Sequence, residues 1–120
     1  MLNFLRSGPA TPHLTMKDAI ARAASGALTV IDVRDAGEIR ASGTAAGSLH
    51  IPLALIPMKA DPKSPDYDKR LDPAKPTALL CASGARSGMA AQTLKRLGYG
   101  EVHNLGGFGG WASAGGKVSR

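Results

Sequence analysis

The sequence predicts an α/β domain in which a mainly parallel sheet is flanked by helices. Two short runs of apolar and β-branched residues, 28–33 and 77–81, have the composition of strands that are buried on both faces. Segments with helical spacing lie around these runs, and strands that alternate with helices favour parallel pairing. Because the chain has 120 residues, the size of one domain, we expect a lead-in at 1–13 and a single domain at 14–120.

In the first half of the chain, capping residues, glycines and prolines set the expected elements. Thr15 is a good helix N-cap, and Asp18 three residues later fits a capping-box-like start. The helix is expected to end at Ser25–Gly26. The elements expected after it are the buried strand at 28–33, a short helical stretch at 37–41, a turn at 43–47, a brief strand within 48–53 and a helical turn at 54–58.

In the second half, prolines mark a long connection between two regular elements. Five of the eight prolines fall within 57–76 together with mixed charges, which predicts a surface excursion outside the core. Trp111 is expected to anchor the C-terminal helix in the core. The elements expected between them are the strand at 77–81, a loop of small residues, a helix over about 87–97, a strand at 102–105 and a glycine loop at 106–110.

Composition and charge restrict the classes of partner. The formal net charge is +6, but the basic residues are scattered and are not interleaved with aromatics, so we expect no nucleic acid partner. No segment approaches the roughly 20 apolar residues of a membrane span, and no signal-peptide core is recognisable, so we expect no membrane partner. The single cysteine leaves no internal disulfide and no paired-cysteine metal site. We therefore expect no metal or cofactor, and a reducing compartment, most simply the cytoplasm.

Cys81 is the candidate nucleophile. It ends the strand at 77–81, and ligands of parallel sheets bind at the carboxyl ends of strands. A tight loop and a helix follow, so backbone N–H groups and the positive end of the helix can stabilise an anionic sulfur and lower its pKa. We therefore expect a reactive thiol in place of an inert buried cysteine. The residues expected to bind the substrate around it are Ala82, Ser83, Gly84, Ala85, Arg86 and Ser87.

Four segments, in the right order, resemble motifs of the rhodanese family over about 14–111. Residues 81–87, CASGARS, match the family's C-x-x-G-x-R-S loop, and 31–35 with the later Glu38 match its D-V-R-[DE]…E segment. Residues 43–52 correspond to G-H-I-x-G-A-x-N-I-P, and 104–111 to the closing glycine-rich segment that ends in Trp. Thr44 and His50 stand where the family usually has His and Asn; since neither belongs to the loop, they bear on local packing and turn geometry.

The resemblance implies a rhodanese-like three-layer domain and a two-step sulfur transfer. The Cys81 thiolate would take the outer sulfur of a small anionic donor such as thiosulfate as a persulfide, and an acceptor would then remove it. That acceptor is cyanide in an assay, and a thiol or a protein in the cell. Asp32, Arg34 and Glu38 are expected to be structural near the site, with Arg34 paired to Glu38.

Two other readings remain open. A cysteine phosphatase shares the loop, the helix end and the arginine, but separates Cys and Arg by five residues, whereas four separate Cys81 from Arg86. The smaller loop favours a sulfane sulfur over a tetrahedral phosphate. The second alternative is a module that docks partners or carries a persulfide within a sulfur pathway.

Overall fold

A four-stranded parallel sheet forms the centre of the molecule. The computed structural model describes residues 14–120, and the lead-in expected at 1–13 lies outside the described residues. The strands are β1 (Thr29–Asp32), β3 (Leu49–His50), β4 (Thr77–Cys81) and β5 (Val102–Gly107), in the order β3-β1-β4-β5. All three pairings are parallel, so the predicted parallel sheet is confirmed.

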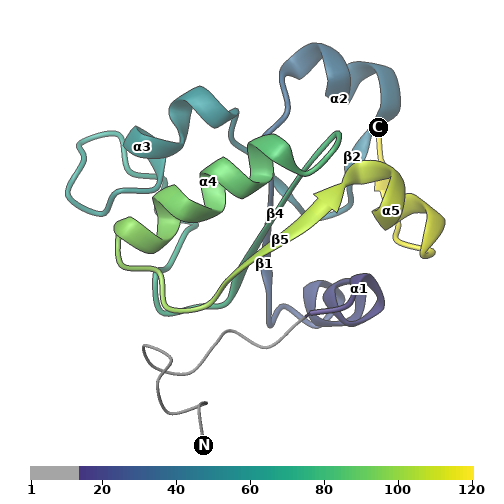
Figure 1. The fold of residues 1–120 in the computed structure, drawn as a ribbon, viewed down its shortest axis with the longest axis horizontal. Helices are drawn as coiled ribbons and strands as arrows, with labels where there is room; N and C mark the ends of the chain where they lie inside the picture. Colours follow the sequence, from purple (N-terminus) through teal and green to yellow (C-terminus); the bar gives the residue numbers. More distant parts are fainter. Residues whose placement is uncertain (1–13) are drawn as a thin grey trace, which may run out of the picture.

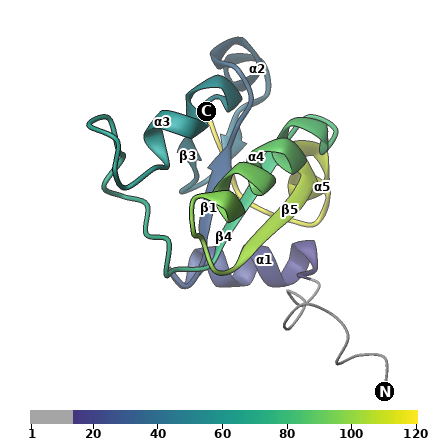
Figure 2. The same cartoon turned by 60° about the vertical axis from the view of Figure 1, so that its left-hand side comes forward.

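Helices cover both faces of this sheet, which gives the expected three layers (Figure 1). On one side lie α1 (Met16–Ala24) and α5 (Phe108–Ser113), and on the other lie α3 (Ile56–Lys59), preceded by the 3-10 turn Leu53–Leu55, and α4 (Ala85–Arg96). The remaining helix, α2 (Ala36–Ser42), lies beyond the carboxyl ends of the strands (Figure 2). Within residues 14–120, no helix has the length and apolar character needed to cross a bilayer.

The two faces of the sheet bury two separate apolar clusters. Alternating side chains of a strand point to opposite faces, so Leu79 packs toward α3 and α4 whereas Leu80 packs toward α1 and α5. All five residues of β4 are buried, as its continuous apolar run predicts. Cys81 belongs to the Leu79 cluster, and the α4 layer is therefore the one that shapes its surroundings.

Two of the local predictions concern single residues of α1 and α5. Thr15 caps α1, since its hydroxyl accepts a hydrogen bond from the Asp18 N–H at 3.0 Å. Trp111 is 2% exposed, and its indole N–H donates to the Lys117 carbonyl at 2.8 Å. The N-cap role of Thr15 and the burial of Trp111 are thus confirmed.

The turn expected at 43–47 is partly wrong, because Thr44 and Ala45 form a strand. This strand, β2 (Thr44–Ala45), pairs antiparallel with β6 (Val118–Ser119). The partner lies more than 70 residues away in the sequence, and two-residue strands carry no periodicity to detect. Gly43 allows the close approach: it has φ +80°, and a Cβ there would lie 2.8 Å from the Ser119 carbonyl oxygen.

The predicted glycine loop at 106–110 is also wrong. Gly106 and Gly107 belong to β5, and Phe108 begins α5. The helix expected at about 87–97 begins two residues earlier, at Ala85, because Gly84 adopts φ +99° and lets the chain enter the helix at once. Arg86 and Ser87 therefore lie in the first turn of α4.

The excursion at 57–76 contributes to the core, contrary to the prediction. Its turns form no strand, but Ala60 and Leu71 are buried in the α4-side cluster. Tyr99, from beyond β4, donates its hydroxyl to the Ala60 carbonyl at 2.9 Å and holds the segment against the core. Prolines indicate where regular structure stops, but they do not show whether the connecting chain is buried.

Candidate active site around Cys81

Cys81 is the last residue of β4, at the carboxyl edge of the sheet, and has no exposed surface. The chain turns immediately after it, and the Gly84 N–H points back to donate to Sγ at 2.9 Å. From the first turn of α4, the Ser87 hydroxyl lies 3.3 Å from the same sulfur. The loop residues Ala82, Ser83 and Ala85 are exposed, so the rim faces solvent while the sulfur lies beneath it.

These neighbours lower the pKa of the Cys81 thiol from its usual 9.0 to about 7. Burial alone raises the pKa, since it disfavours the charged form. Hydrogen bonds from the Ser87 side chain and from the backbone N–H groups of Ser87, Gly84 and Ser83 outweigh burial and stabilise the thiolate. Comparable amounts of thiol and thiolate are therefore present at neutral pH.

Arg86 forms an ion pair with Glu38, and the expected pairing of Arg34 with Glu38 is wrong. The two terminal nitrogens of Arg86 donate to the two Glu38 oxygens at 2.7 and 2.8 Å. Glu38 is oriented for this by a capping box at the start of α2, in which Asp35 is the N-cap. The hydrogen bonds from Arg86 hold the pKa of Glu38 at about 2, and the same pairing raises the pKa of Arg86.

Arg34 instead pairs with Asp32, and this buried ion pair braces the edge of the sheet. Its Nη2 lies 2.7 Å from Asp32 Oδ2, and it also donates to the Gly43 carbonyl at 2.9 Å. The guanidinium carbon lies 4.5 Å from the centre of the Phe108 ring. Within residues 14–120, no buried side-chain nitrogen or oxygen lacks a hydrogen-bond partner. Asp32 and Arg34 thus support the backbone close to the site.

Thr44 and His50, the two residues that depart from the family pattern, both form hydrogen bonds to the Asp32–Arg34 pair. Thr44 donates its hydroxyl to Asp32 Oδ2 at 2.7 Å, and it contacts the Ser48 hydroxyl at 3.0 Å. The His50 Nε2 lies 2.7 Å from the Arg34 carbonyl, and since a carbonyl only accepts, Nε2 carries the proton. Both residues thus affect local packing and not the Cys81 loop.

Asn104 is the site residue that the sequence analysis missed. It lies on β5, and its side chain reaches the Cys81 loop from the neighbouring strand. Its Oδ1 accepts from the Ser87 hydroxyl at 2.6 Å, and its Nδ2 donates to the Gly84 carbonyl at 2.9 Å. Asn104 could have been recognised from its place, because it is an amide side chain on β5, the strand that pairs with the strand ending at Cys81.

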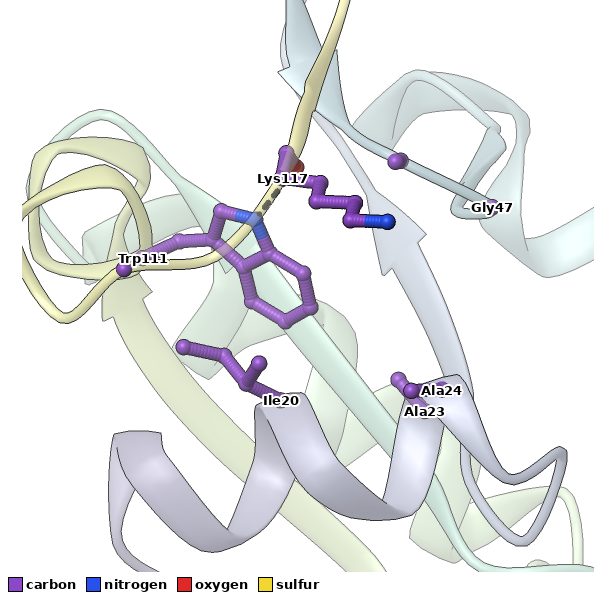
Figure 3. Close-up of a pocket in the computed structure, with 8 residues that line it drawn as sticks. Ile20, Ala23, Ala24, Gly47, Trp111 and Lys117 are labelled. Atoms are coloured by element: carbon purple, nitrogen blue, oxygen red, sulfur yellow. Dashed lines mark hydrogen bonds between the residues drawn. The ribbon is translucent and has the colours of Figure 1, made fainter.

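A separate cavity of about 500 Å³ lies between α1, α5 and the Ala46–Gly47 turn. Figure 3 shows the Lys117 side chain extending beside Trp111, with Ile20, Ala23 and Ala24 of α1 across from the ring. None of the residues that line this cavity belongs to the Cys81 loop. Within the described part of the chain, no three His, Cys, Asp or Glu side chains are grouped as a metal site requires.

A family model described as "Rhodanese-like domain" matches residues 15–114. An uncharacterized protein of Bacillus subtilis, YqhL, is 39% identical over 90 residues, which are 74% of this chain and 62% of the Bacillus protein. A protein of Allochromatium vinosum named sulfurtransferase is 37% identical over 87 residues, which are 72% of this chain and 73% of that protein.

A solved structure from Rhodopseudomonas palustris is similar over most of both chains. It is 37% identical with a TM-score of 0.77, and the alignment covers 88% of this chain and 83% of the other. That protein is described as one of unknown function and a possible tyrosine phosphatase. The fold of the present chain is thus shared along nearly the whole described region, at 37% sequence identity.

Proposed function

The chain belongs to the rhodanese-like domain family, and we propose that it is a sulfurtransferase whose nucleophile is Cys81. The observation that carries this proposal is a buried thiol with a pKa of about 7 in a loop whose N–H groups point at the sulfur. Such a loop stabilises negative charge on the attacking sulfur and on the persulfide formed from it. A free catalytic thiol works in a reducing compartment, and the cytoplasm is the proposed location.

In the first step, the Cys81 thiolate attacks the outer sulfur of a small anionic donor such as thiosulfate. A sulfur–sulfur bond forms to Sγ, and the bond within thiosulfate breaks, so that its electron pair leaves with sulfite. The N–H groups of Ser83, Gly84 and Ser87 are the donors that stabilise the anions. Arg86 lies close enough for the sulfur charge to raise its pKa, and it offsets the Glu38 carboxylate, which would otherwise repel an anionic donor.

In the second step, an acceptor nucleophile attacks the outer sulfur of the persulfide. The Cys81 sulfur leaves as a thiolate, and the product is thiocyanate when cyanide is the acceptor. Because Cys81 is the only cysteine in the sequence, no neighbouring thiol of this chain can release the sulfur as a disulfide. The acceptor in the cell is therefore another molecule, and we propose a thiol of a small molecule or of a protein.

Mass spectrometry after treatment with thiosulfate tests the proposal. We expect one added sulfur atom on the peptide that contains Cys81, and its loss after addition of cyanide. The variant Cys81→Ser should fold normally, gain no sulfur and form no thiocyanate above background. Thiocyanate production by Cys81→Ser at the native rate would overturn the proposal.

A phosphatase activity is the second candidate, because the R. palustris relative is described as a possible tyrosine phosphatase. Four residues between Cys81 and Arg86 leave a smaller loop than the five of cysteine phosphatases. In addition, the Arg86 guanidinium is engaged by Glu38. Hydrolysis of p-nitrophenyl phosphate decides the matter: we expect no turnover beyond that of Cys81→Ser, and a Cys81-dependent rate would favour the phosphatase.

A further inference from the structure

The Asn104 side chain connects β5 to Gly84 in the loop after Cys81 and to Ser87 in the first turn of α4. Its amide orientation is fixed, because Oδ1 accepts from the Gly106 N–H at 2.9 Å and Nδ2 donates to the Gly84 carbonyl at 2.9 Å. Asn104 is itself exposed, so its orientation depends on these hydrogen bonds; Nδ2 also lies close to α4, since a Cβ on Gly88 would lie 3.2 Å from it. Oδ1 is therefore presented to Ser87 as an acceptor and never as a donor.

Ser87 has one proton and two neighbours that compete for it. Its hydroxyl lies 2.6 Å from Asn104 Oδ1 and 3.3 Å from Cys81 Sγ, and Ser87 has no exposed surface to admit an alternative partner. The short distance to a pure acceptor places the proton on the Asn104 side. In that state the Ser87 oxygen offers a lone pair to the sulfur, which suits the neutral thiol as the donor.

Ionisation of Cys81 requires the opposite arrangement. The thiol proton leaves to solvent, and the Ser87 hydroxyl must turn its proton from Asn104 to the thiolate. We propose that Asn104 is a positioning residue that sets the reactivity of Cys81 by competing with the thiolate for the proton of Ser87. Asn104 thus favours the neutral thiol, although it also anchors the loop through the Gly84 carbonyl. The effect of Asn104 on the Cys81 thiol does not depend on the proposed function. Only its consequence for sulfur transfer rests on the proposed role of Cys81 as the nucleophile.

The charged groups that face the loop are the same whether or not Asn104 is present. Arg86 approaches from α4, Glu38 and Asp35 from α2, and the Asp32–Arg34 pair lies at the end of β1. β5 contributes the uncharged Asn104. Replacing its amide by an apolar group therefore changes no charge; it removes the hydrogen bond from Ser87 together with those to Gly84 and Gly106.

The experiment measures the pH dependence of Cys81 alkylation by iodoacetamide, which reports the thiolate and needs no sulfur transfer. Asn104→Leu frees the Ser87 hydroxyl, so the alkylation midpoint should move to lower pH by about one unit, the size of one hydrogen bond gained. Asn104→Asp holds the Ser87 proton more strongly and adds a negative charge, so the midpoint should move to higher pH. A general loosening of the loop would instead shift the alkylation midpoints of both variants in the same direction.

The decisive comparison repeats Asn104→Leu in a Ser87→Ala background. If Asn104 acts through the Ser87 proton, the substitution no longer moves the midpoint there; a shift equal to that in the native background overturns the proposal. Gln92→Leu removes an exposed amide from α4 and is the matched control, for which no shift is expected. Circular dichroism establishes that each variant is folded. Failure of persulfide formation with these shifts intact would contradict the proposed function alone.

Discussion

At the scale of single residues, hydrogen bonds explain the lowered pKa of Cys81 better than formal charge does. The one cation of the loop, Arg86, is held by both oxygens of Glu38, so much of its charge is balanced. The sulfur instead receives a backbone N–H at 2.9 Å, and the Ser87 hydroxyl, which can turn its proton to a thiolate, lies 3.3 Å away. Because these donors are fixed by the fold, the lowered pKa of Cys81 exists only in the folded protein.

This lowered pKa makes stability depend on pH. In the unfolded chain the thiol keeps its proton up to about pH 9, whereas in the folded protein it loses the proton near pH 7. The unfolded state therefore binds more protons between these values, and the free energy of unfolding should rise with pH from about 7 to 9. Urea denaturation of the native protein and of Cys81→Ser measures this, and the rise should be absent in the variant. Parallel pH profiles for the two proteins would contradict it.

The substitution Arg86→Ala is expected to weaken binding of the sulfur donor with little loss of stability. Arg86 is partly exposed, and an exposed ion pair contributes at most about 1 kcal/mol to folding. Removal of Arg86 leaves the Glu38 carboxylate uncompensated beside the loop, so KM for the anionic thiosulfate should rise about tenfold, the size of one interaction with a charged group. Arg22→Ala is the control, since Arg22 forms an equally exposed pair with Glu101. The prediction fails if both variants change KM alike.

At the scale of elements, the active loop depends on the strand beside it. The loop after β4 packs so closely on β5 that a Cβ on Gly107 would lie 2.4 Å from the Ala82 carbonyl oxygen. The strand that ends at Cys81 was predicted with its correct bounds, because a continuous apolar run is a local pattern, whereas the loop after it is shorter than predicted, since α4 begins at Ala85. The contribution of β5 was not predicted, since it depends on which strand lies beside β4.

Gly107→Ala tests this close packing. The clash is between backbone and an added carbon, so one of the two segments must shift, and we expect a loss of about 1–3 kcal/mol in unfolding free energy together with slower sulfur transfer. Gly109→Ala is the matched control, because no atom lies within 4 Å of a Cβ there and it sits in α5. That variant should be as stable as the native protein or more stable. Equal thermal unfolding midpoints for the two variants would contradict the argument.

The pairing of Glu38 shows why some contacts between elements were predicted wrongly. Arg34 and Glu38 are four residues apart, a spacing that invites a local ion pair. In the structure, however, Arg34 lies before the N-cap Asp35 and turns into the core, while Glu38 faces α4. Sequence spacing describes partners within one helix, and here the helix begins between the two residues.

At the scale of the whole molecule, the sheet divides the core into two layers, and only one of them contains Cys81. The α3–α4 layer contains Cys81, whereas the α1–α5 layer contains Trp111 and Leu28. The parallel α/β architecture was predictable, because buried strands alternate with helices in the sequence. The pairing of β2 with β6 was not, because a two-residue strand is specified by its distant partner.

Leu28→Ala should damage stability without changing the chemistry. Leu28 is 4% exposed and precedes β1, at the edge of the sheet opposite to Cys81. Its truncation should lower the free energy of unfolding by about 2–5 kcal/mol. The alkylation midpoint of Cys81 should stay near pH 7, as in the native protein. A displaced midpoint in this variant would mean that the two layers are coupled through the sheet.

The complete burial of the Cys81 sulfur also selects its reaction partners by shape. A reactant must reach an atom that has no exposed surface, so every reactant must displace part of the rim residues 82–85, and a slender one such as thiosulfate or cyanide would displace less of it than a broad molecule. Two copies of this chain cannot bring their sulfurs together without opening both loops, and we therefore expect air to produce disulfide-linked dimers slowly. A protein that takes sulfur from Cys81 would need its thiol on a narrow projection, such as a loop tip or a chain end.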